Sequence, residues 1–338
     1  MGEAPVHGHR VAMLDHAVGE LALQCGQPAR GLQLRCEIHG ALDPARSNAI
    51  LFPTWFGGRH PHNHWIIGSG RALDTDRYCV IVVNALGNGE SSSPSNDPQL
   101  MAGREPVAVS LYDNVRAQAD LVHGLGIKRL HAVVGRSMGA QQALQWGCLF
   151  PERVQRVFAF CGLPRTMPHN QAVLQAMEDV LLFGADRPEH AVTLAARIYA
   201  GWSLSSAFFS QRFGGSAAPS AAEWIEQSIV RNLQTFGLHD LLTLIRTWKS
   251  ADVSANPVFG GDLRAALGAC AARTLLLTIS HDLLFPPADF DQALHCLPAA
   301  ELRVLHSVWG HRAAAPGGSE QDIATLESAL RSFLQAAV

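Results

Sequence analysis

Short apolar runs alternate with longer amphipathic stretches along most of the chain. The runs are continuously apolar, which is typical of strands buried on both faces of a parallel sheet. The strands expected from them are Leu32–Ile38, Ala49–Phe52, Tyr78–Ala85, Leu130–Val134, Val154–Cys161, Thr274–Ser280 and Leu302–His306. Helical spacing of apolar residues predicts helices over Tyr112–Leu125, Met138–Leu149 and Asp322–Leu334. This alternation predicts an α/β fold with a mostly parallel sheet flanked by helices.

The pattern changes between residues 165 and 262, where helical periodicity continues without a convincing pair of strands. We therefore expect a helical cap over residues 165–262, inserted into a core domain that comprises residues 1–164 and 263–338. The cap should cover the carboxyl edge of the sheet.

Composition narrows the class of protein. The 338 residues are 48% hydrophobic and carry a formal charge of −3, with acids and bases well mixed. The sequence has no basic face and no run of like charges, so it does not indicate nucleic acid or an anionic membrane as a partner. No apolar stretch is long enough to span a bilayer, and the first residues do not resemble a signal peptide. The 7 cysteines are scattered and several lie in apolar runs, so we expect reduced thiols in a cytoplasmic enzyme.

One motif indicates the chemistry. Gly135-Arg136-Ser137-Met138-Gly139 is a G-x-S-x-G placed between an apolar strand and an Ala-rich helix. The sharp turn of a nucleophile elbow demands small residues two positions before and after the serine, which the two glycines supply. Ser137 is the predicted nucleophile. The N–H of Met138, at the start of the helix, is the predicted first donor to an oxyanion.

A nucleophilic serine needs a base and an acid that orients the base, and in this fold they follow the serine in the order acid, then histidine. Asp282 follows the apolar run TLLLTIS and is the predicted acid. His311 follows the last expected strand and is the predicted base. His281, His295 and His306 are weaker alternatives, because they project elsewhere, fall in a helix or lie within a strand.

The loop after the strand at residues 49–52 should supply the second oxyanion donor, for which we favour the N–H of Phe56 over that of Trp55. The loop continues into RHPHNHW, where His60, His62 and His64 occupy alternate positions. On an extended segment such histidines would share a face, as a metal site requires. Because Pro61 interrupts a regular strand and a serine apparatus is already present, we assign them with Trp55 to the wall of the substrate pocket. We expect no metal and no other cofactor.

Several separated segments resemble the homoserine O-acetyltransferase group of the α/β-hydrolases. They are GSGRALDTDRYCVIVVNALGNG, VRAQADLVHGLGIKRLHAVVGRSMGAQQALQWGCLFPERV, HDLLFPP and WGHRAA. The resemblance implies an α/β-hydrolase sheet with a helical cap, a dimer through the cap helices, and a ping-pong reaction through an acyl-serine. Ser137, Asp282 and His311 match the family's triad positions.

The chain departs from that family where the acyl acceptor would bind. The loop LGNGESSSPSN differs from the family's glycine-rich, cysteine-containing loop, and Arg312 follows His311 where the family usually has aspartate. The family arginine that holds the homoserine carboxylate falls on Glu178 in an ungapped match, and a carboxylate there would repel homoserine. The alternative is that Glu178 is a solvated position on a cap helix. Arg136 is either a packed or salt-bridged neighbour of the elbow or a cation facing the substrate.

Two reactions are compatible with the sequence, and a third alternative is a protein without catalytic activity. The departures favour a serine hydrolase that acts on a small acyl ester, or a related acyl bond, with water as the acceptor. An acyl-coenzyme A-dependent O-acetyltransferase would use the same triad but would exclude water. A noncatalytic binding protein would keep the fold without the chemistry. The expected partner is a small acyl substrate, and a homodimer is expected through the cap.

Overall fold

The computed structural model describes residues 11–215 and 219–337. Its centre is an eight-stranded sheet with the order β1-β4-β6-β5-β9-β10-β11-β12. The strands are β1 (Val11–Ala17), β4 (Gln33–His39), β5 (Ala49–Pro53), β6 (Cys79–Val83), β9 (Ala132–Arg136), β10 (Arg156–Phe160), β11 (Arg273–Ile279) and β12 (Ala300–Leu305). Two short antiparallel ribbons are formed by β2 (Glu20–Ala22) with β3 (Pro28–Arg30) and by β7 (Met101–Ala102) with β8 (Glu105–Pro106).

In the eight-stranded sheet, the six neighbouring strands β6, β5, β9, β10, β11 and β12 pair in parallel. The strand β4 pairs antiparallel with β6, and β1 pairs antiparallel with β4. This arrangement confirms the predicted α/β class with a mostly parallel sheet. All seven expected strands are present, and β5, β6 and β10 are buried at every position. The sequence analysis missed β1, because this edge strand is largely exposed and so has no apolar run.

Helices cover both faces of the sheet. The core helices are α1 (Leu111–Gly124), α2 (Met138–Leu149), α9 (Leu263–Gly268), α10 (Asp291–Cys296) and α11 (Glu320–Gln335). Side chains alternate between two cores, so that Val133 of β9 packs with α1 and α2 on one face while its neighbour Val134 packs with α11 on the other. Short connecting helices are η1 (His60–Ile66), η2 (Pro98–Leu100), η3 (Pro151–Arg153), η5 (Pro287–Phe290) and η6 (Gly310–Arg312).

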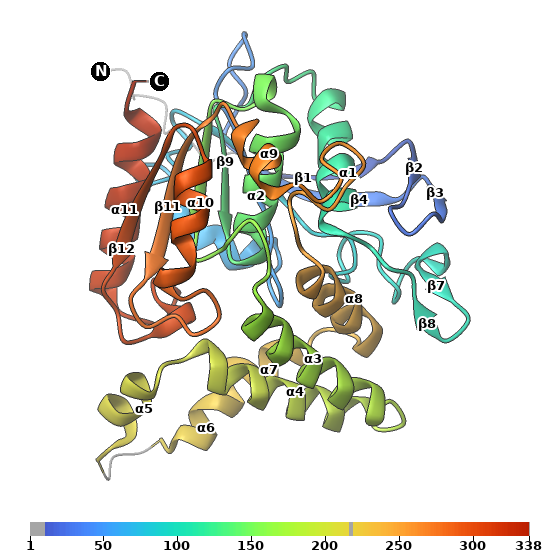
Figure 1. Cartoon of the computed structure of the whole chain (residues 1–338), viewed down its shortest axis with the longest axis vertical. Coiled ribbons are helices and arrows are strands. Elements are labelled where there is room, and N and C mark those ends of the chain that lie inside the picture. The colour runs from blue at the N-terminus through green and yellow to red at the C-terminus, as the bar shows by residue number, and fades with distance from the viewer. Residues whose placement is uncertain (1–10, 216–218, 338) are drawn as a thin grey trace, which may run out of the picture.

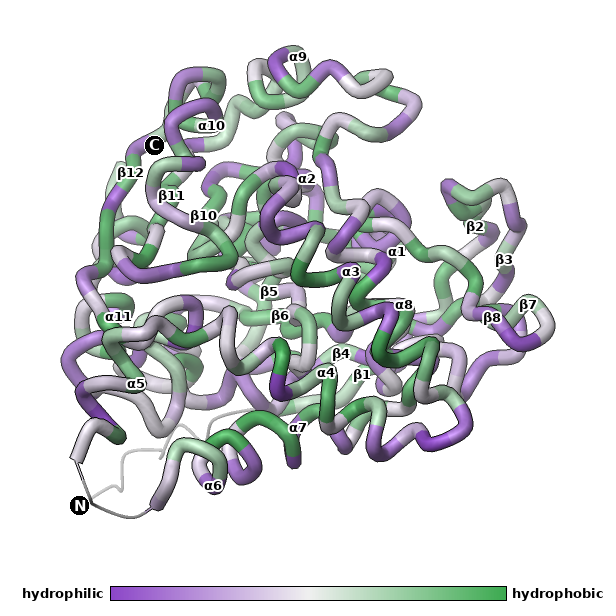
Figure 2. The backbone as a smooth tube through the Cα atoms, turned by 60° about the horizontal axis from the view of Figure 1, so that its bottom comes forward, coloured by the Kyte–Doolittle hydropathy of each residue, from purple (hydrophilic) through white to green (hydrophobic). Residues whose placement is uncertain are grey.

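The chain between β10 and β11 is helical, and much of it forms a separate layer below the sheet in Figure 1. This insertion contains α3 (Pro168–Phe183), α4 (Pro188–Ser203), α5 (Ser206–Phe213), α6 (Ala221–Ile225), η4 (Glu226–Val230), α7 (Arg231–Leu233) and α8 (Leu238–Lys249). Figure 2 shows hydrophobic and hydrophilic stretches alternating along these helices as they do along the core. The boundaries of the cap at residues 165 and 262 stay a prediction.

None of the helices in the described ranges combines the length and the apolar character that crossing a bilayer demands.

Candidate active site

Ser137 lies at the turn between β9 and α2, with a φ of 54° and a ψ of −126°. A positive φ is uncommon for a residue with a side chain and stores about 1–3 kcal/mol of strain. Two glycines make the turn sterically feasible. A Cβ at Gly135 would lie 2.0 Å from the carbonyl oxygen of Gly139, and one at Gly139 would lie 2.6 Å from that of Pro53. The turn holds the Ser137 hydroxyl at the carboxyl end of the sheet, as a nucleophile elbow requires.

The structure brings the three predicted triad residues together. The Nε2 atom of His311 lies 2.8 Å from the Ser137 Oγ, and its Nδ1 lies 2.8 Å from Oδ2 of Asp282. The other carboxylate oxygen of Asp282 accepts the backbone N–H groups of Leu284 and Phe285, at 2.8 and 3.0 Å. An ionised Asp282 fixes the proton of the imidazole on Nδ1, which leaves the lone pair of Nε2 to accept the proton of the serine.

His311 is enclosed by aromatic rings and charged neighbours. The rings of Trp248 and Phe285 lie 6.4 and 5.5 Å from the imidazole, centroid to centroid. Burial alone would lower the pKa of His311. The Asp282 carboxylate, assisted by Cys161, outweighs that effect and raises the pKa well above its ordinary value of 6.5. The imidazole is therefore a stronger base than free histidine.

The predicted oxyanion donors lie beside the serine. Met138 is the first residue of α2, where the N–H groups of a helix have no intrahelical acceptor. Phe56 follows β5, and its ring packs against Tyr199 and Trp248 at 5.4 and 5.6 Å. Its N–H makes no hydrogen bond to a backbone or side-chain acceptor within residues 11–215 and 219–337. Both N–H groups are thus available, and their role stays a prediction.

A cavity of about 250 Å³ adjoins His311 and continues between the sheet and the cap. Most of its wall is apolar, from residues of β5, β9, β10, the cap and α11. The predicted pocket residues Trp55, Phe56, His62 and Arg136 line this cavity. His60, His64 and Glu178 are not part of its lining.

The three histidines of RHPHNHW diverge because the segment is the 3₁₀ helix η1. With about three residues per turn, alternate side chains do not share a face. His60 accepts a hydrogen bond from the side-chain amide of Asn84 at 2.9 Å, and His64 reaches Glu37 at 2.6 Å. Only His62 of the three faces the cavity. The extended geometry considered for this segment is therefore wrong.

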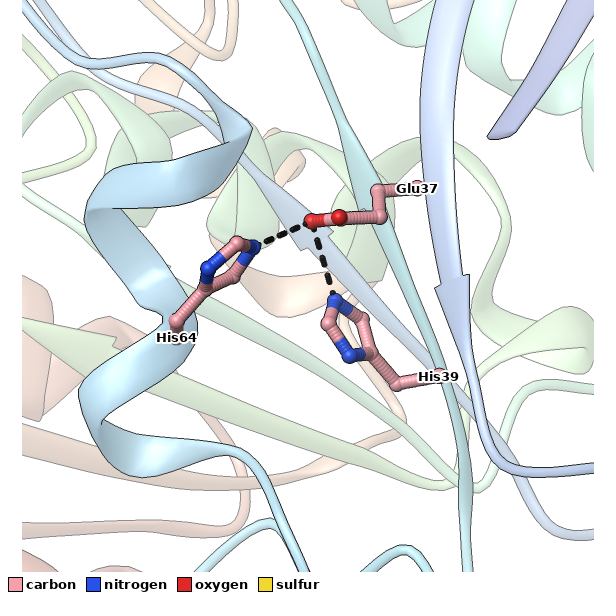
Figure 3. Close-up of side chains that lie close together, drawn as sticks. All are labelled: Glu37, His39 and His64. Carbon is pink, nitrogen blue, oxygen red and sulfur yellow. Dashed lines mark hydrogen bonds and ion pairs between the residues drawn. The ribbon is translucent and has the colours of Figure 1, made fainter. Parts of the chain in front are cut away.

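His64 joins a group that could hold a metal ion, together with Glu37 and His39 of β4 (Figure 3). Residues 37 and 39 lie two apart on a strand, so both side chains point to the same face. The Nε2 atoms of His39 and His64 lie 3.1 and 2.6 Å from Oε2 of Glu37. Glu37 and His39 are buried, while the His64 side chain is 48% exposed.

Glu178 lies on α3, away from the cavity, in a buried ion cluster. Its carboxylate accepts Nε of Arg246 at 2.7 Å and pairs with Nζ of Lys249. Burial alone would raise the pKa of Glu178, but the two cations outweigh it and lower the pKa. The sequence analysis considered Glu178 as a carboxylate facing the substrate or as a solvated position on a cap helix, and neither describes this buried ion cluster. The side chain neither lines the cavity nor lies in solvent.

The sequence analysis assigned no role in the site to three residues that lie near it. Cys161, which directly follows β10, has its sulfur within 4.8 Å of ligand atoms of Asp282 and His311. Asn63 and Arg312 line the cavity. Their sequence signals were present. Cys161 ends the strand after the elbow, Arg312 replaces the family's aspartate, and Asn63 lies among the histidines.

Comparisons with known proteins agree with this geometry. The sequence profile of the alpha/beta hydrolase fold matches residues 50–307. The chain is 36% identical over 308 residues to an ethyl acetate hydrolase of Pseudomonas veronii, covering 87% of each chain. The structure of the acetyl esterase MekB superimposes with a TM-score of 0.88 at 31% identity, over 97% of each chain. A homoserine O-acetyltransferase of Symbiobacterium thermophilum is 30% identical, over 93% of this chain and 92% of its own.

The fold and the similarity to esterases define an enzyme of the hydrolase type. The chain belongs to the α/β-hydrolase fold family. Within that family its relatives include esterases and homoserine O-acetyltransferases, as the resemblance in the sequence implied.

Proposed function

We propose that the chain is a serine esterase that hydrolyses small acyl esters through an acyl-serine intermediate. The observation that carries the proposal is the closed hydrogen-bond chain from Asp282 through His311 to Ser137, with both bonds to the imidazole at 2.8 Å. The similarity to an ethyl acetate hydrolase and an acetyl esterase supports an acetyl or similarly short acyl group. The largely apolar cavity beside His311 supports the same substrate class.

The reaction follows from the positions of these atoms. Ser137 Oγ attacks the ester carbonyl carbon while its proton moves to Nε2 of His311. The N–H groups of Met138 and Phe56 would stabilise the oxyanion that forms. His311 then gives the proton to the departing alcohol, which leaves an acyl-serine. A water molecule, deprotonated by His311, attacks the acyl carbon, and collapse of the second intermediate releases the acid and restores Ser137.

An O-acetyltransferase is the second candidate, favoured by the similarity to a homoserine O-acetyltransferase over nearly the whole chain. The two functions share the acyl-serine and differ in the acceptor. Arg246 and Lys249, two cations of the cap helix α8, both pair with Glu178, so neither is free to hold the carboxylate of homoserine. The similarity to an ethyl acetate hydrolase and an acetyl esterase is also greater than that to the transferase, and the hydrolase is therefore better supported.

Product analysis separates the two reactions. Ethyl acetate, p-nitrophenyl acetate and acetyl-coenzyme A are offered with water alone and with added homoserine. We expect free acetate in every case, with no acetyl transfer to homoserine. O-acetylhomoserine formed from acetyl-coenzyme A faster than acetate would make the transferase the correct function.

A noncatalytic binding role is disfavoured because all three triad residues are present and connected.

The protein should need no macromolecular partner other than a second copy of itself, bound through the cap. We expect this homodimer to work in the cytoplasm on small-molecule substrates. The free state of all seven cysteines agrees with a reducing compartment. Phe183, 94% exposed at the end of α3, is a position at which a contact through the cap can be probed. Light scattering of the wild type and of Phe183→Ser tests the dimer.

A further inference from the structure

The cavity beside His311 carries positive charge without a matching carboxylate. Two arginines, Arg136 and Arg312, line it together with His62 and His311, and no Asp or Glu is among its lining residues. Arg136 donates to the backbone carbonyls of His311 at 2.8 Å and Ala314 at 3.1 Å, and so has partial compensation.

Arg312 has less. Its side chain is partly buried, yet its guanidinium forms no ion pair or hydrogen bond with any residue in the described parts of the chain. A desolvated cation without a counter-charge is unfavourable, and like-charged Arg136 nearby adds to the cost. Groups with perturbed pKa values cluster at functional sites, where a bound ligand can supply the missing charge.

A second, independent observation is the side chain of Asn63. It lines the same cavity, is 1% exposed, and both its amide nitrogen and its amide oxygen lack a partner among the described residues. Buried amides are almost always hydrogen-bonded in native proteins. An unpaired guanidinium and an unpaired amide in one apolar cavity provide the groups that hold and orient a carboxylate.

We propose that Arg312, with Asn63 and Arg136, forms an anion subsite, and that the preferred substrates are small esters that carry a carboxylate in addition to the scissile bond. The proposal rests on the esterase function and names its substrate class. The carboxylate belongs either to the acyl part or to the alcohol part of the ester, and both give the same interaction with Arg312.

Matched ester pairs test the subsite. Monoethyl succinate is compared with ethyl succinamate for the acyl part, and 3-acetoxypropanoate with 3-acetoxypropanamide for the alcohol part. In at least one pair the carboxylate ester should have a kcat/KM roughly tenfold or more above its amide, as expected for a charge-assisted hydrogen bond. In Arg312→Gln the ratio should fall toward one, and Arg312→Lys should restore part of it. Arg303→Gln, which removes an exposed arginine of β12 that pairs with Glu301, should leave the ratio unchanged.

Binding measured without turnover separates failure of the subsite from failure of the esterase. Calorimetry on Ser137→Ala should show the same preference for the carboxylate member of a pair, again lost when Arg312→Gln is added. Equal affinity for both members of both pairs would overturn the subsite while leaving the esterase function intact. A carboxylate preference in binding, with no ester hydrolysed by the wild type, would overturn the esterase function alone.

A different observation carries a second proposal, at the group formed by Glu37, His39 and His64. Figure 3 shows the three side chains converging on one point, with Oε2 of Glu37 between the two Nε2 atoms. Ligand atoms around a tetrahedral zinc ion are about 3.3 Å apart, given metal–ligand distances of about 2.0–2.2 Å. The observed separations of 3.1 and 2.6 Å therefore need only a small opening. Within the described ranges, Glu37 has no Lys or Arg as an ion partner.

We infer that this group binds a divalent transition metal such as Zn²⁺ through two imidazoles and one carboxylate, with water at the exposed side next to His64. Each histidine coordinates through Nε2 once its proton lies on Nδ1. The site lies outside the triad, and its expected role is to fix η1 against β4. Its loss should therefore act on stability and leave the acyl chemistry in place.

Metal analysis of the full chain tests this site. After chelation and reloading with Zn²⁺, the wild type should retain about one ion per chain and gain in Tm, because a ligand that binds only the folded state stabilises it. His64→Ala, at a half-exposed position, should lose the ion and the Tm gain, whereas His295→Ala, an exposed histidine of α10, should keep both. Co²⁺ loading should give the intense visible absorption of a tetrahedral site in the wild type and in His295→Ala but not in His64→Ala. Zinc retained equally by His64→Ala, or not retained by the wild type, would show that the group is a hydrogen-bonded cluster.

Discussion

The molecule contains two groups in which a carboxylate is hydrogen-bonded to a histidine, and they differ in almost everything else. At the carboxyl end of the sheet, Asp282 and His311 are buried and their chain of hydrogen bonds ends on the hydroxyl of Ser137. On β4, Glu37 bonds two histidines, and one of these, His64, is half exposed. The first group ends on a serine hydroxyl beside the N–H groups of Met138 and Phe56, whereas the second has two imidazoles around one carboxylate oxygen and an open side.

The contrast shows that residue types alone do not specify chemistry. Asp282 accepts two backbone N–H groups on its second oxygen, so its orientation is fixed and its imidazole has a single productive tautomer. Glu37 places one oxygen between two imidazoles, which suits replacement of the shared protons by a metal. The surroundings thus direct one carboxylate toward proton transfer and the other toward coordination.

The largest expected effect is at the nucleophile. Ser137→Ala should lower kcat/KM by several orders of magnitude and abolish labelling by a fluorophosphonate, because the acyl-serine cannot form. His311→Ala should cost a similar factor, and the double variant should be little worse than either single one, because the triad acts as a unit. Ser228→Ala, a serine of the cavity wall outside the triad, should still be labelled. Labelling of Ser137→Ala would show that another residue is the nucleophile.

A matched pair of carboxylate substitutions compares the two groups directly. Asp282→Asn should lower kcat by about 10⁴-fold, since the amide favours the wrong imidazole tautomer. Glu37→Gln should act mainly on Tm and should change kcat/KM far less than Asp282→Asn does. Comparable losses of activity in the two variants, with both proteins folded by circular dichroism, would contradict the assignment of catalysis to one group only.

The pH dependence should sharpen the same distinction. His311 acts as a base only when neutral, so kcat/KM falls as the pH drops through its pKa. Because the Asp282 carboxylate raises that pKa above the ordinary 6.5, the acid limb of the profile should lie above pH 6.5. In Asp282→Asn the raising charge is gone and burial remains, so the limb of the residual activity should move to lower pH. A limb that does not move would mean that another group controls it.

Smaller effects are expected along η1. His62→Ala should raise KM or change substrate preference severalfold with kcat nearly constant, because only His62 of the three histidines lines the cavity. His60→Ala is its matched control and should leave KM for the same ester close to the wild-type value. Equal changes in the two variants would indicate a loss of η1 structure and not of a substrate contact.

The sheet and the triad could be predicted because each has a local signal. Buried parallel strands are continuous apolar runs, and the elbow has glycines at fixed positions around Ser137. The direction in which His60, His62 and His64 point depends on whether the segment is extended or helical. That is decided by contacts with Glu37 of β4 and with Asn84, which directly follows β6. Such contacts leave no periodic pattern in the sequence.

Glu178 illustrates the same limit, and it also gives the last prediction, for the smallest effect on activity. The match to the family placed this position in the cap but could not reveal Arg246 and Lys249, which come from α8 about 70 residues later and pair with it. Glu178→Gln leaves Lys249 without its anion and Arg246 with Glu105 alone, and should cost about 1–3 kcal/mol of unfolding free energy, with kcat/KM nearly unchanged.

The sign of the pH dependence follows from the direction of the shift in pKa. The folded state lowers the pKa of Glu178 below its ordinary value of 4.5, so its contribution to stability is fully present above pH 4.5 and is lost as the pH falls through the folded pKa. The difference in unfolding free energy between wild type and Glu178→Gln should therefore be constant near neutral pH and shrink below pH 4.5. Urea unfolding at a series of pH values measures it. A large loss of activity at neutral pH in a stably folded Glu178→Gln would instead place this carboxylate in the path of the substrate, as the sequence comparison first indicated.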